Sequence, residues 1–557
     1  MSARRHPEGA FRERGLGWTI PRDEATIAAM RAQGIWRNRT LYDDAVDLMA
    51  TDPARVIAIA GDRRVTVAEA VGAGKAIAAA LSMRGLRRGD VVTYVLPNWV
   101  EAISINMAAA FLGLTVNPIV PIYREAELRQ ILADCGSRAI FVPGRFRSID
   151  FTQVLAAIRA DLPALELVVG VRSDGDVSLD ALEQEGRHLP FQPTPAAPDA
   201  IKLVMYTSGT TGPAKGVLHT HETLGRVMQV SIGNWHLPPG PRILIATPVS
   251  HVTGFMWGLE SPFVAGTQVV LMERWNPDEA VELIDRHAID LTTGAAPFLQ
   301  DTVDAARRAG SGLPSLRRFG CGGAAVSPDL IRRAFDTFDH ATAYRIYGST
   351  EAPNVGQGHA LAEDRERAAT TDGHPLDYDV RIVGEEGGDL PAGQDGEIVA
   401  RGPSLFVGYT DAALNVAAFD DRGYFRTGDI GHLTERGDIV ITDRKKDLII
   451  RGGENLSPKE VEDALASHPL VREVAVVGRP HDRLGETVCA FIVPQGGRAI
   501  TLADITAWMA TAGLARQKHP EHLECVDALP KTPAGKVRKD ILRKQLADRS
   551  RKEISDE

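Results

Sequence analysis

Short apolar runs alternate with longer segments of helical pattern along the first part of the chain. Apolar residues from Val56 to Ala60 predict a strand. Thr66 and Glu69 then have the spacing of a capping box, which begins a helix. The same order recurs as a buried strand at Val91 to Leu96 and a helix at Trp99 to Leu112. Repeated strand and helix units predict a parallel sheet covered by helices.

Proline and glycine mark the later connections. The prolines between His188 and Asp199 predict an extended surface connector, which leads to a strand candidate at Leu203 to Tyr206. Two further segments, Asp389 to Gly396 and Thr434 to Gly437, carry the turn residues of a smaller β-rich section.

Beyond Asp443 the pattern changes to a compact unit of βαβ type. A helix is expected near Ser457 to Ser467, with strands near Val474 to Val477 and Val488 to Val493. This part is long enough to be a domain of its own. We therefore expect an α/β protein with a large N-terminal domain of parallel-rich sheets, helices and a small β-section, followed by a small α+β C-terminal domain.

Composition narrows the class of protein. A chain of 557 residues with 44% hydrophobic and 24% charged residues is typical of a soluble protein with more than one domain. The net charge of -10 gives no bulk attraction to nucleic acid or to an anionic membrane. The most apolar region, Met107 to Val120, is too short to span a bilayer. No nucleic-acid partner and no integral membrane segment are expected.

Cysteine usage and the N-terminal residues bear on the compartment. The four cysteines contain no CxxC pair, so neither a metal knuckle nor a disulfide scaffold is indicated. No apolar stretch follows the first arginines, so no export signal is expected. Both observations fit a reducing cytoplasm.

The segment from Tyr206 to Gly216 is the most informative part of the sequence. It places hydroxyls, glycines and one lysine directly after a predicted strand, which is the chemistry of a triphosphate cradle. No Walker A register fits it, and the alternative is a Gly/Thr-rich turn from a strand to a helix. The candidate ATP-binding residues in this segment are Thr207, Ser208, Gly209, Thr210, Thr211, Gly212 and Lys215.

The segment resembles the signature loop of the adenylate-forming superfamily, which includes acyl-CoA synthetases, luciferases and the adenylation domains of peptide synthetases. Further segments match this superfamily in the expected order from about residue 40 to about residue 540. The resemblance implies that ATP and Mg²⁺ bind here, with Thr211 as a catalytic residue and magnesium ligand.

Residues Tyr347 to Glu351 resemble the second nucleotide element of the superfamily. The resemblance implies that the ring of Tyr347 stacks on adenine and that Glu351 coordinates Mg²⁺ and takes part in catalysis. Read alone, the segment could instead begin a helix with Thr350 near the cap. The remaining ATP-binding candidates here are Gly348, Ser349 and Thr350.

Small residues follow one another from Gly322 to Ala325. Such residues permit close approach of backbone to a ligand, although they are also typical of a tight turn. The resemblance places this segment beside adenine and the acyl tunnel. It implies nucleotide contacts from Gly323, Ala324 and Ala325, and acyl contacts from Gly322 and Gly348.

Two polar segments resemble the ribose site and the joint between domains. Asp429 is the candidate acceptor for the ribose hydroxyls, the alternative being a turn acid that caps the next strand. Arg444 is the second ribose candidate, and Lys446 is the expected hinge between domains 1–444 and 445–557, although a charge run is often only a solvated turn. The candidate CoA tunnel residues are Gly452 and Gly453.

The C-terminal segment Pro530 to Lys536 resembles the loop whose last lysine reaches the adenylating site. Lys536 is therefore a candidate for both ATP binding and catalysis, because one mobile ammonium group can stabilise charge on the α-phosphate and the attacking carboxylate. Without the motif, a lysine in a Pro/Gly loop would be read as a surface residue.

Residues Pro248 to Phe255 occupy the position of the acyl-pocket segment of the superfamily. His251 is expected near the carboxylate end and is a catalytic candidate, while Gly254 is expected to leave room for a bulky acyl group. A buried structural histidine is the alternative. Peptide-synthetase domains that take amino acids carry an aspartate in this region to pair the substrate amine. None is present between Pro248 and Phe255, which disfavours amino acids. The candidate acyl-pocket residues are His251, Val252, Gly254 and Phe255.

One other glycine motif is interpreted as packing. Gly72 to Ile77 begins like a dinucleotide fingerprint, but Ile77 stands where glycine or alanine is required. The motif also lies within a predicted helix. We interpret these glycines as sites of close contact between helices.

The resemblance implies an ATP-dependent carboxylic acid:CoA ligase with a mobile C-terminal domain. The acid and Mg-ATP would give acyl-AMP and pyrophosphate, and the thiol of CoA would then displace AMP. A homodimer is compatible with this family. The stretches Trp36 to Tyr42 and His251 to Gly258 resemble ligases for medium-chain, alicyclic or aryl-substituted acids.

Three other functions stay open. A stand-alone adenylating enzyme could load a carrier protein, but related fatty acyl-AMP ligases tend to carry an insertion in the large domain, and the run from Asp443 to Pro458 is uninterrupted. Nothing in the sequence requires a luciferase-like oxygenase. A catalytically silent nucleotide-binding module is disfavoured by the joint presence of Thr211, Glu351, Asp429 and Lys536.

Overall fold

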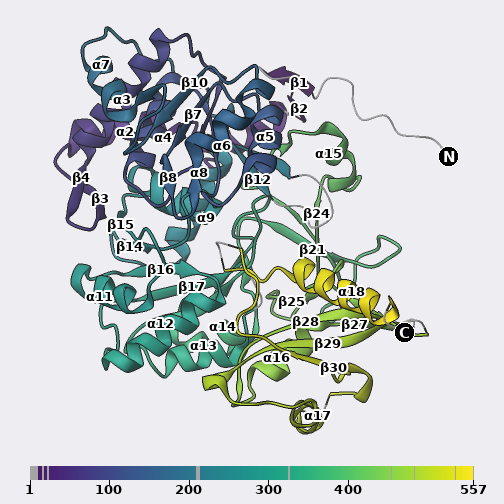
Figure 1. Cartoon of the computed structure of the whole chain (residues 1–557). Helices are drawn as coiled ribbons and strands as arrows, with labels where there is room; N and C mark the ends of the chain where they lie inside the picture. The colour runs from purple at the N-terminus through teal and green to yellow at the C-terminus, as the bar shows by residue number, and fades with distance from the viewer. Residues whose placement is uncertain are drawn as a thin grey trace.

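Among the described residues, the strands form two large sheets, two smaller ones and three two-stranded pairs (Figure 1). The structure is a computed structural model. It describes residues 11–14, 18–21, 24–207, 214–323, 326–452, 454–481, 483–512, 514–532 and 535–555. In Figure 1 the residues from β26 onward, the C-terminal unit, lie beside the part of the molecule that carries α12, α13 and β25.

The first large sheet has eight strands in the order β11-β10-β7-β5-β6-β12-β13-β23. The strands from β11 to β12 are parallel, and β13 and β23 are added antiparallel. The bounds are β5 Val91–Tyr94, β6 Thr115–Pro118, β7 Ala139–Val142, β10 Leu167–Gly170, β11 Val177–Ser178, β12 Ile201–Thr207, β13 Lys215–Thr220 and β23 Gly408–Tyr409.

The second large sheet has seven strands in the order β18-β17-β16-β14-β15-β3-β4. All neighbours are parallel except β3 and β4. The bounds are β3 Val56–Ala60, β4 Arg63–Thr66, β14 Arg242–Ile245, β15 Gln268–Leu271, β16 Leu291–Gly294, β17 Arg318–Gly322 and β18 Thr342–Ile346.

Helices cover the two large sheets, as the alternating pattern predicts, and the last three described α-helices of the chain belong to the C-terminal unit. The bounds are α1 Glu24–Ala32, α2 Leu41–Thr51, α3 Val67–Met83, α4 Glu101–Leu112, α5 Glu125–Asp134, α6 Phe151–Ile158, α7 Leu179–Arg187, α8 His221–Asn234, α9 Val252–Phe255, α10 Ser261–Val264, α11 Pro277–His287, α12 Ala296–Ala309, α13 Pro328–Phe335, α14 Arg365–Thr370, α15 Ala412–Ala418, α16 Pro458–Ala466, α17 Leu502–Thr511 and α18 Lys539–Ser555. Single turns of 3-10 helix lie at Arg159–Asp161, Ala362–Asp364, Gln495–Gly497 and Arg516–Lys518, and a π-helix lies at Met256–Glu260.

Helices α3 and α4 show how the local pattern and the packing agree. Thr66 accepts a hydrogen bond from the backbone of Glu69 and completes the predicted capping box. Nearly all of α4 is buried, because the helix is apolar on every side. A Cβ at Gly74 would lie 2.6 Å from Cγ of Met107, so the glycine permits close contact between the two helices. The interpretation of this motif as helix packing is confirmed at Gly74, whereas a Cβ on Gly72 would meet no atom within 4 Å.

Strand β13 runs antiparallel to β12, and Thr207 pairs with Lys215. The segment between them therefore joins two antiparallel strands. The alternative of a turn from a strand to a helix is wrong, because tertiary pairing and not the turn composition decides which element comes after the glycines.

The smaller β-section is a four-stranded antiparallel sheet in the order β21-β22-β24-β25. The connections from β21 to β22 and from β24 to β25 lie at the two predicted turn segments. The bounds are β21 Asp379–Val383, β22 Gly396–Arg401, β24 Phe425–Leu433 and β25 Ile439–Arg444. Three two-stranded pairs are formed by β1 Phe11–Arg14 with β2 Trp18–Pro21, β8 Arg145–Phe146 with β9 Ile149–Asp150, and β19 Gly356–Gln357 with β20 His374–Pro375.

The C-terminal unit contains the predicted helix and strands in a different arrangement from the expected βαβ unit. Helix α16 precedes both long strands, and these strands are antiparallel neighbours. The parallel pair is β29 with β30, and α17 lies between them in sequence. The bounds are β26 Ile449–Arg451, β27 Glu454–Leu456, β28 Val471–His481, β29 Gly485–Pro494 and β30 His522–Cys525.

Two expectations about the chain as a whole are answered by the structure. Among the helices of the described ranges, none is long and apolar enough to cross a membrane. Each of the four cysteines is present as a thiol and not as half of a disulfide.

Candidate active site

A cleft of about 800 Å³ lies between the C-terminal unit and the ends of the second sheet and the four-stranded sheet. Residues far apart in the sequence meet along its walls. The predicted site residues that line it are Gly323, Tyr347, Gly348, Asp429, Arg444, Lys446 and Lys536.

The two predicted ribose residues contact each other in this cleft. Asp429 lies on β24 directly opposite Arg444 on β25. The Arg444 Nε donates to Asp429 Oδ1 at 2.8 Å, and the hydroxyl of Tyr347 donates to Asp429 Oδ2 at 2.9 Å. Asp429 lies inside a strand, so the alternative of a turn acid is wrong. Burial raises the pKa of Tyr347 well above its ordinary value, so the hydroxyl remains a donor.

Lys536 enters the cleft from a tight loop of the C-terminal unit. The backbone N–H of Lys536 donates to Thr532 Oγ1 at 3.1 Å, and the Thr532 N–H donates to the Lys536 carbonyl at 2.7 Å. Gly535 has φ +83°, and a Cβ there would lie 3.2 Å from Ala295 and 3.3 Å from Phe298. Gly535 thus packs against the start of α12, one residue before Lys536, which lines the cleft.

Burial and nearby cations change the charge of Lys536. Its pKa is lowered to about 7, first by burial and then by the positive charges of Arg444 and Lys446, while Asp429 opposes this change. His251, the N-cap residue of α9, has a pKa lowered to about 4 by burial and by the charge of Lys536. His251 is therefore neutral at neutral pH, and it is not among the residues that line the cleft.

Residues 347 to 351 form a turn. The Ser349 N–H donates to the Ala352 carbonyl at 3.0 Å, and the Ala352 N–H donates to the Ser349 hydroxyl at 3.2 Å. The alternative of a helix start with Thr350 near the cap is wrong. A Cβ on Gly348 would lie 2.5 Å from a backbone nitrogen across the turn, so no larger residue fits this conformation.

Two side chains from other elements hold this turn in place. The His219 Nε2 lies 2.7 Å from the Thr350 carbonyl, and burial lowers the pKa of this histidine to about 4. The hydroxyl of Tyr409 donates to Glu351 Oε1 at 2.9 Å. The carboxylate that the sequence assigns to the metal is thus held by a tyrosine from β23.

The structure describes the two ends of the segment from Tyr206 to Gly216, the phosphate segment. Thr207 ends β12, Lys215 begins β13, and Lys215 Nζ lies 5.5 Å from the centre of the Tyr409 ring. The predicted residues that lie outside the described residues are Ser208, Gly209, Thr210, Thr211, Gly212, Ala324, Ala325 and Gly453.

The acyl-pocket candidates are mostly part of the packed interior. Val252 and Phe255 belong to the main hydrophobic core. A Cβ on Gly254 would lie 2.1 Å from the Pro248 carbonyl, so Gly254 permits a close backbone contact and not the free space that its size suggests. A Cβ on Gly322 would lie 2.4 Å from a carbonyl of β18.

The chain leaves the four-stranded sheet for the C-terminal unit through a short turn at 445–447. Lys446 lies in this turn and lines the cleft. Gly452 has φ +61° in the turn between β26 and β27, and its N–H donates to the Leu484 carbonyl at 2.7 Å. Gly452 is not among the cleft-lining residues.

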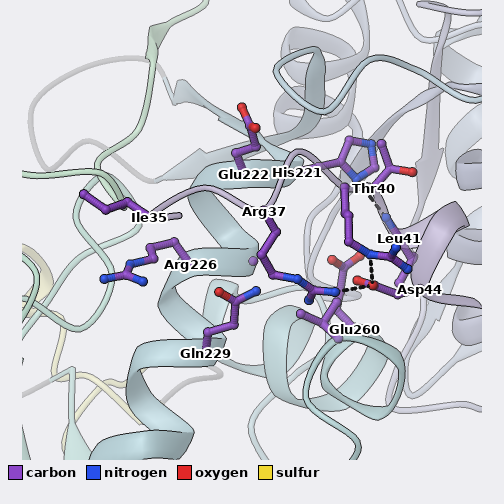
Figure 2. Close-up of a pocket in the computed structure, with 13 residues that line it drawn as sticks. Ile35, Arg37, Thr40, Leu41, Asp44, His221, Glu222, Arg226, Gln229 and Glu260 are labelled. Carbon is purple, nitrogen blue, oxygen red and sulfur yellow. Dashed lines mark hydrogen bonds and ion pairs between the residues drawn. The ribbon is translucent and has the colours of Figure 1, made fainter. Parts of the chain in front are cut away.

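A second cavity of about 20 Å³ lies between residues 35–44, the start of α8 and the π-helix at Met256–Glu260 (Figure 2). Arg37 and Arg39 both donate to Asp44, at 2.6 and 2.8 Å. This volume is close to that of one water molecule. The cavity is therefore a water-sized polar space. Several of its charged side chains pair with residues outside its lining: Glu222 with Arg31, Arg226 with Asp377 and Glu260 with Lys202.

The segment Trp36 to Tyr42, from which a substrate class is predicted, contributes residues to the lining of this cavity. Glu260 lies at its other side and follows the acyl-pocket segment in the sequence. Glu260 also forms a buried ion pair with Lys202, which does not line the cavity. Neither the segment nor Glu260 is among the residues that line the large cleft.

Sequence profiles of known families match most of the chain. The profile of the AMP-binding enzyme family matches residues 47–410, and that of the AMP-binding enzyme C-terminal domain matches residues 460–536. The chain belongs to the AMP-binding enzyme family. The predicted resemblance to adenylate-forming enzymes is thereby confirmed.

Curated relatives of this AMP-binding enzyme include acid:CoA ligases. The medium-chain fatty-acid–CoA ligase of Escherichia coli is 30% identical, covering 99% of this chain and 98% of that protein. The indoleacetate–CoA ligase of Aromatoleum aromaticum is 34% identical, covering 87% and 94%. The ATP-bound crystal structure of MatB from Rhodopseudomonas palustris superposes with a TM-score of 0.81 at 27% identity, covering 91% of this chain and 99% of that chain. The protein is an AMP-forming acid–thiol ligase, and the α/β fold is confirmed.

Sequence reasoning missed two residues of this AMP-binding enzyme's site. Tyr409 and His219 contact the turn that carries Glu351, yet they come from β23 and β13. A tyrosine that follows a glycine does not form a recognisable motif, and neither does a histidine within a strand. Only their spatial position identifies them.

The lowered pKa of Lys536 predicts a pH dependence for this AMP-binding enzyme. The ammonium form is present below a pH of about 7 and is lost above it. We expect kcat/KM for ATP, which reports the free enzyme, to fall up to about tenfold per pH unit above this value. In kcat the decline should begin at higher pH, because nucleotide phosphates favour the ammonium form. Initial rates of pyrophosphate release between about pH 6 and pH 9 measure both. A flat kcat/KM profile would contradict the assignment of Lys536.

Proposed function

We propose that this protein is an ATP-dependent ligase that joins a medium-chain, alicyclic or aryl-substituted carboxylic acid to CoA. The observation that supports adenylation most directly is the approach of Lys536 to the cleft that contains Tyr347, Asp429 and Arg444. A lysine there can stabilise negative charge that develops on the α-phosphate.

In the first half-reaction an oxygen of the acid attacks the α-phosphorus, and pyrophosphate leaves. Asp429 would accept the ribose hydroxyls, Arg444 would contact the same sugar, and Tyr347 would lie against adenine. Their present contacts support these roles, because the three side chains are already fixed to one another at the cleft wall.

Magnesium would be held by Glu351 and Thr211. The Glu351 carboxylate fits this role, since Oε1 accepts from Tyr409 and Oε2 has no hydrogen-bond partner among the described residues. Bound Mg²⁺ would neutralise phosphate charge and favour the departure of pyrophosphate. The backbone groups of the phosphate segment and Lys215 would orient the β- and γ-phosphates.

In the second half-reaction the thiol sulfur of CoA attacks the acyl carbon, AMP leaves, and the thiol proton passes to solvent. We infer a boundary between domains 1–444 and 445–557, with Lys446 as the hinge. The turn at 445–447 supports this position, since it connects the last strand of one sheet to the first strand of the next. Rotation there would withdraw Lys536 and bring Gly452 and Gly453 to the thiol.

A panel of acids tests the substrate class. With Mg-ATP and CoA, we expect AMP release and an equal loss of free thiol with hexanoate, cyclohexanecarboxylate or an arylpropionate. Pyrophosphate release without thiol loss would instead favour the loading of a carrier protein. Amino acids serve as the matched negative substrates, because the segment from Pro248 to Phe255 provides no aspartate for an amine. Turnover of amino acids alone would contradict the proposal.

A further inference from the structure

Tyr409 contacts two groups of the site that lie on different elements. Its hydroxyl donates to Glu351 Oε1 at 2.9 Å, and its ring lies 5.5 Å from Lys215 Nζ. The side chain is buried, with 5% of its surface exposed. One tyrosine thus touches both the carboxylate assigned to the metal and the lysine assigned to the phosphates.

The backbone around Tyr409 is fixed to both of these elements. The Phe406 N–H donates to the Glu351 carbonyl at 2.8 Å, and the Thr410 N–H donates to the Gly216 carbonyl at 2.8 Å. The Tyr409 N–H donates to Asn415 Oδ1 at 2.8 Å. The segment 406–410 therefore connects the turn of residues 347–351 to the strand that follows the phosphate segment.

A second set of contacts connects residues 406–410 to Tyr206, at the start of the phosphate segment. Asp134, the last residue of α5, accepts hydrogen bonds from the hydroxyls of Thr410, at 2.9 Å, and Tyr206. A Cβ on Gly216 would lie 2.6 Å from the Thr410 side chain, so this region leaves no room for adjustment. The position of Tyr409 relative to both strands of the phosphate segment is thus set by packing.

We propose that Tyr409 is a positioning residue that sets the separation and orientation of Lys215 and Glu351 before Mg-ATP binds. This inference rests on the proposed adenylating function. The hydrogen bond to Oε1 selects one orientation of the Glu351 carboxylate and leaves Oε2 for the cation. The aromatic face favours a position of the Lys215 ammonium beside the ring.

The variant Tyr409→Phe separates the two contacts, because it keeps the ring and removes the hydroxyl. We expect the dissociation constant of ATP, measured by calorimetry, to rise roughly tenfold in the presence of Mg²⁺ and to change little in EDTA. Tyr409→Leu, which also removes the ring, should weaken ATP binding in both conditions. Combining Tyr409→Phe with Glu351→Gln tests whether the loss of ATP binding acts through the Glu351 carboxylate. Once that carboxylate is absent, Tyr409→Phe should weaken ATP binding little further.

Tyr424→Phe is the matched control. Tyr424 is buried, its hydroxyl donates to Asp379, and Arg401 lies 4.5 Å from its ring centre. This variant should leave ATP binding unchanged in both conditions. If the wild-type protein binds Mg-ATP and ATP binding by Tyr409→Phe depends on Mg²⁺ to the same extent, the inference about Tyr409 is overturned and the proposed function is not. Absence of Mg²⁺-dependent ATP binding by the wild-type protein would overturn the proposed function and this inference with it.

Discussion

Replacement of Lys536 by alanine is expected to slow adenylation by about 10²- to 10³-fold or more. Burial and then the charges of Arg444 and Lys446 lower the pKa of Lys536, and these three cationic side chains line the cleft in which the α-phosphate would lie. Acid-dependent release of pyrophosphate measures this loss. Formation of the thioester from supplied acyl-AMP should largely survive, because in the proposed mechanism the lysine serves only the first half-reaction.

A lysine elsewhere in the C-terminal unit provides the control for this variant. Lys518 is held by Glu460 at 2.6 Å and is not among the residues that line the cleft. Lys518→Ala should leave both half-reactions within about twofold of the wild-type rates, as expected for a surface position. Equal losses of both half-reactions in Lys536→Ala would contradict the proposed alternation of domains.

Replacement of Lys202 by methionine is expected to lower the free energy of unfolding by about 3 to 5 kcal/mol. Lys202 and Glu260 form an ion pair in which 3% and 2% of the residue surfaces are exposed. Asn106 also donates to Glu260, at 2.8 Å. Loss of the lysine would leave a buried carboxylate without its cation at the end of the π-helix. Unfolding in urea, followed by tryptophan fluorescence, measures the change.

Two further variants define the origin of this effect. Lys202→Met combined with Glu260→Gln should recover most of the lost stability, because it removes the unpaired charge. The exposed pair of Arg286 and Glu282, at 3.4 Å, offers a control, and Arg286→Met should cost about 0 to 1 kcal/mol. A loss of similar size in the Lys202 and Arg286 variants would show that burial of the pair does not determine the effect.

Local sequence patterns predicted much of the fold. The capping box at Thr66 and the strand at Val56–Ala60 lie where expected, because both depend on neighbours in sequence and on a short repeat of apolar positions. The direction of β13 could not be predicted in this way. Its antiparallel pairing with β12 depends on the whole first sheet, whereas the glycine-rich segment permits several continuations.

The site shows the same division. Motifs identified Asp429, Arg444 and Tyr347 as separate candidates, and the structure joins them through hydrogen bonds across the cleft wall. Gly254 was expected to leave space for a ligand, but the Pro248 carbonyl fills it. The size of a residue follows from its type, whereas the atoms that surround it belong to other residues, and only the structure shows where they lie.

The sequence by itself determined the family, the alternation of strands and helices, and the chemical character of the phosphate and lysine segments. These properties depend on residue type and on spacing within short segments. Only the tertiary structure decided that Tyr409 lies between Glu351 and Lys215, and that hydrogen bonds join Tyr347 and Arg444 to Asp429 in the cleft that Lys536 lines. Such contacts join elements remote in sequence, and their geometry is set by the packing of whole sheets and by the placement of the C-terminal unit.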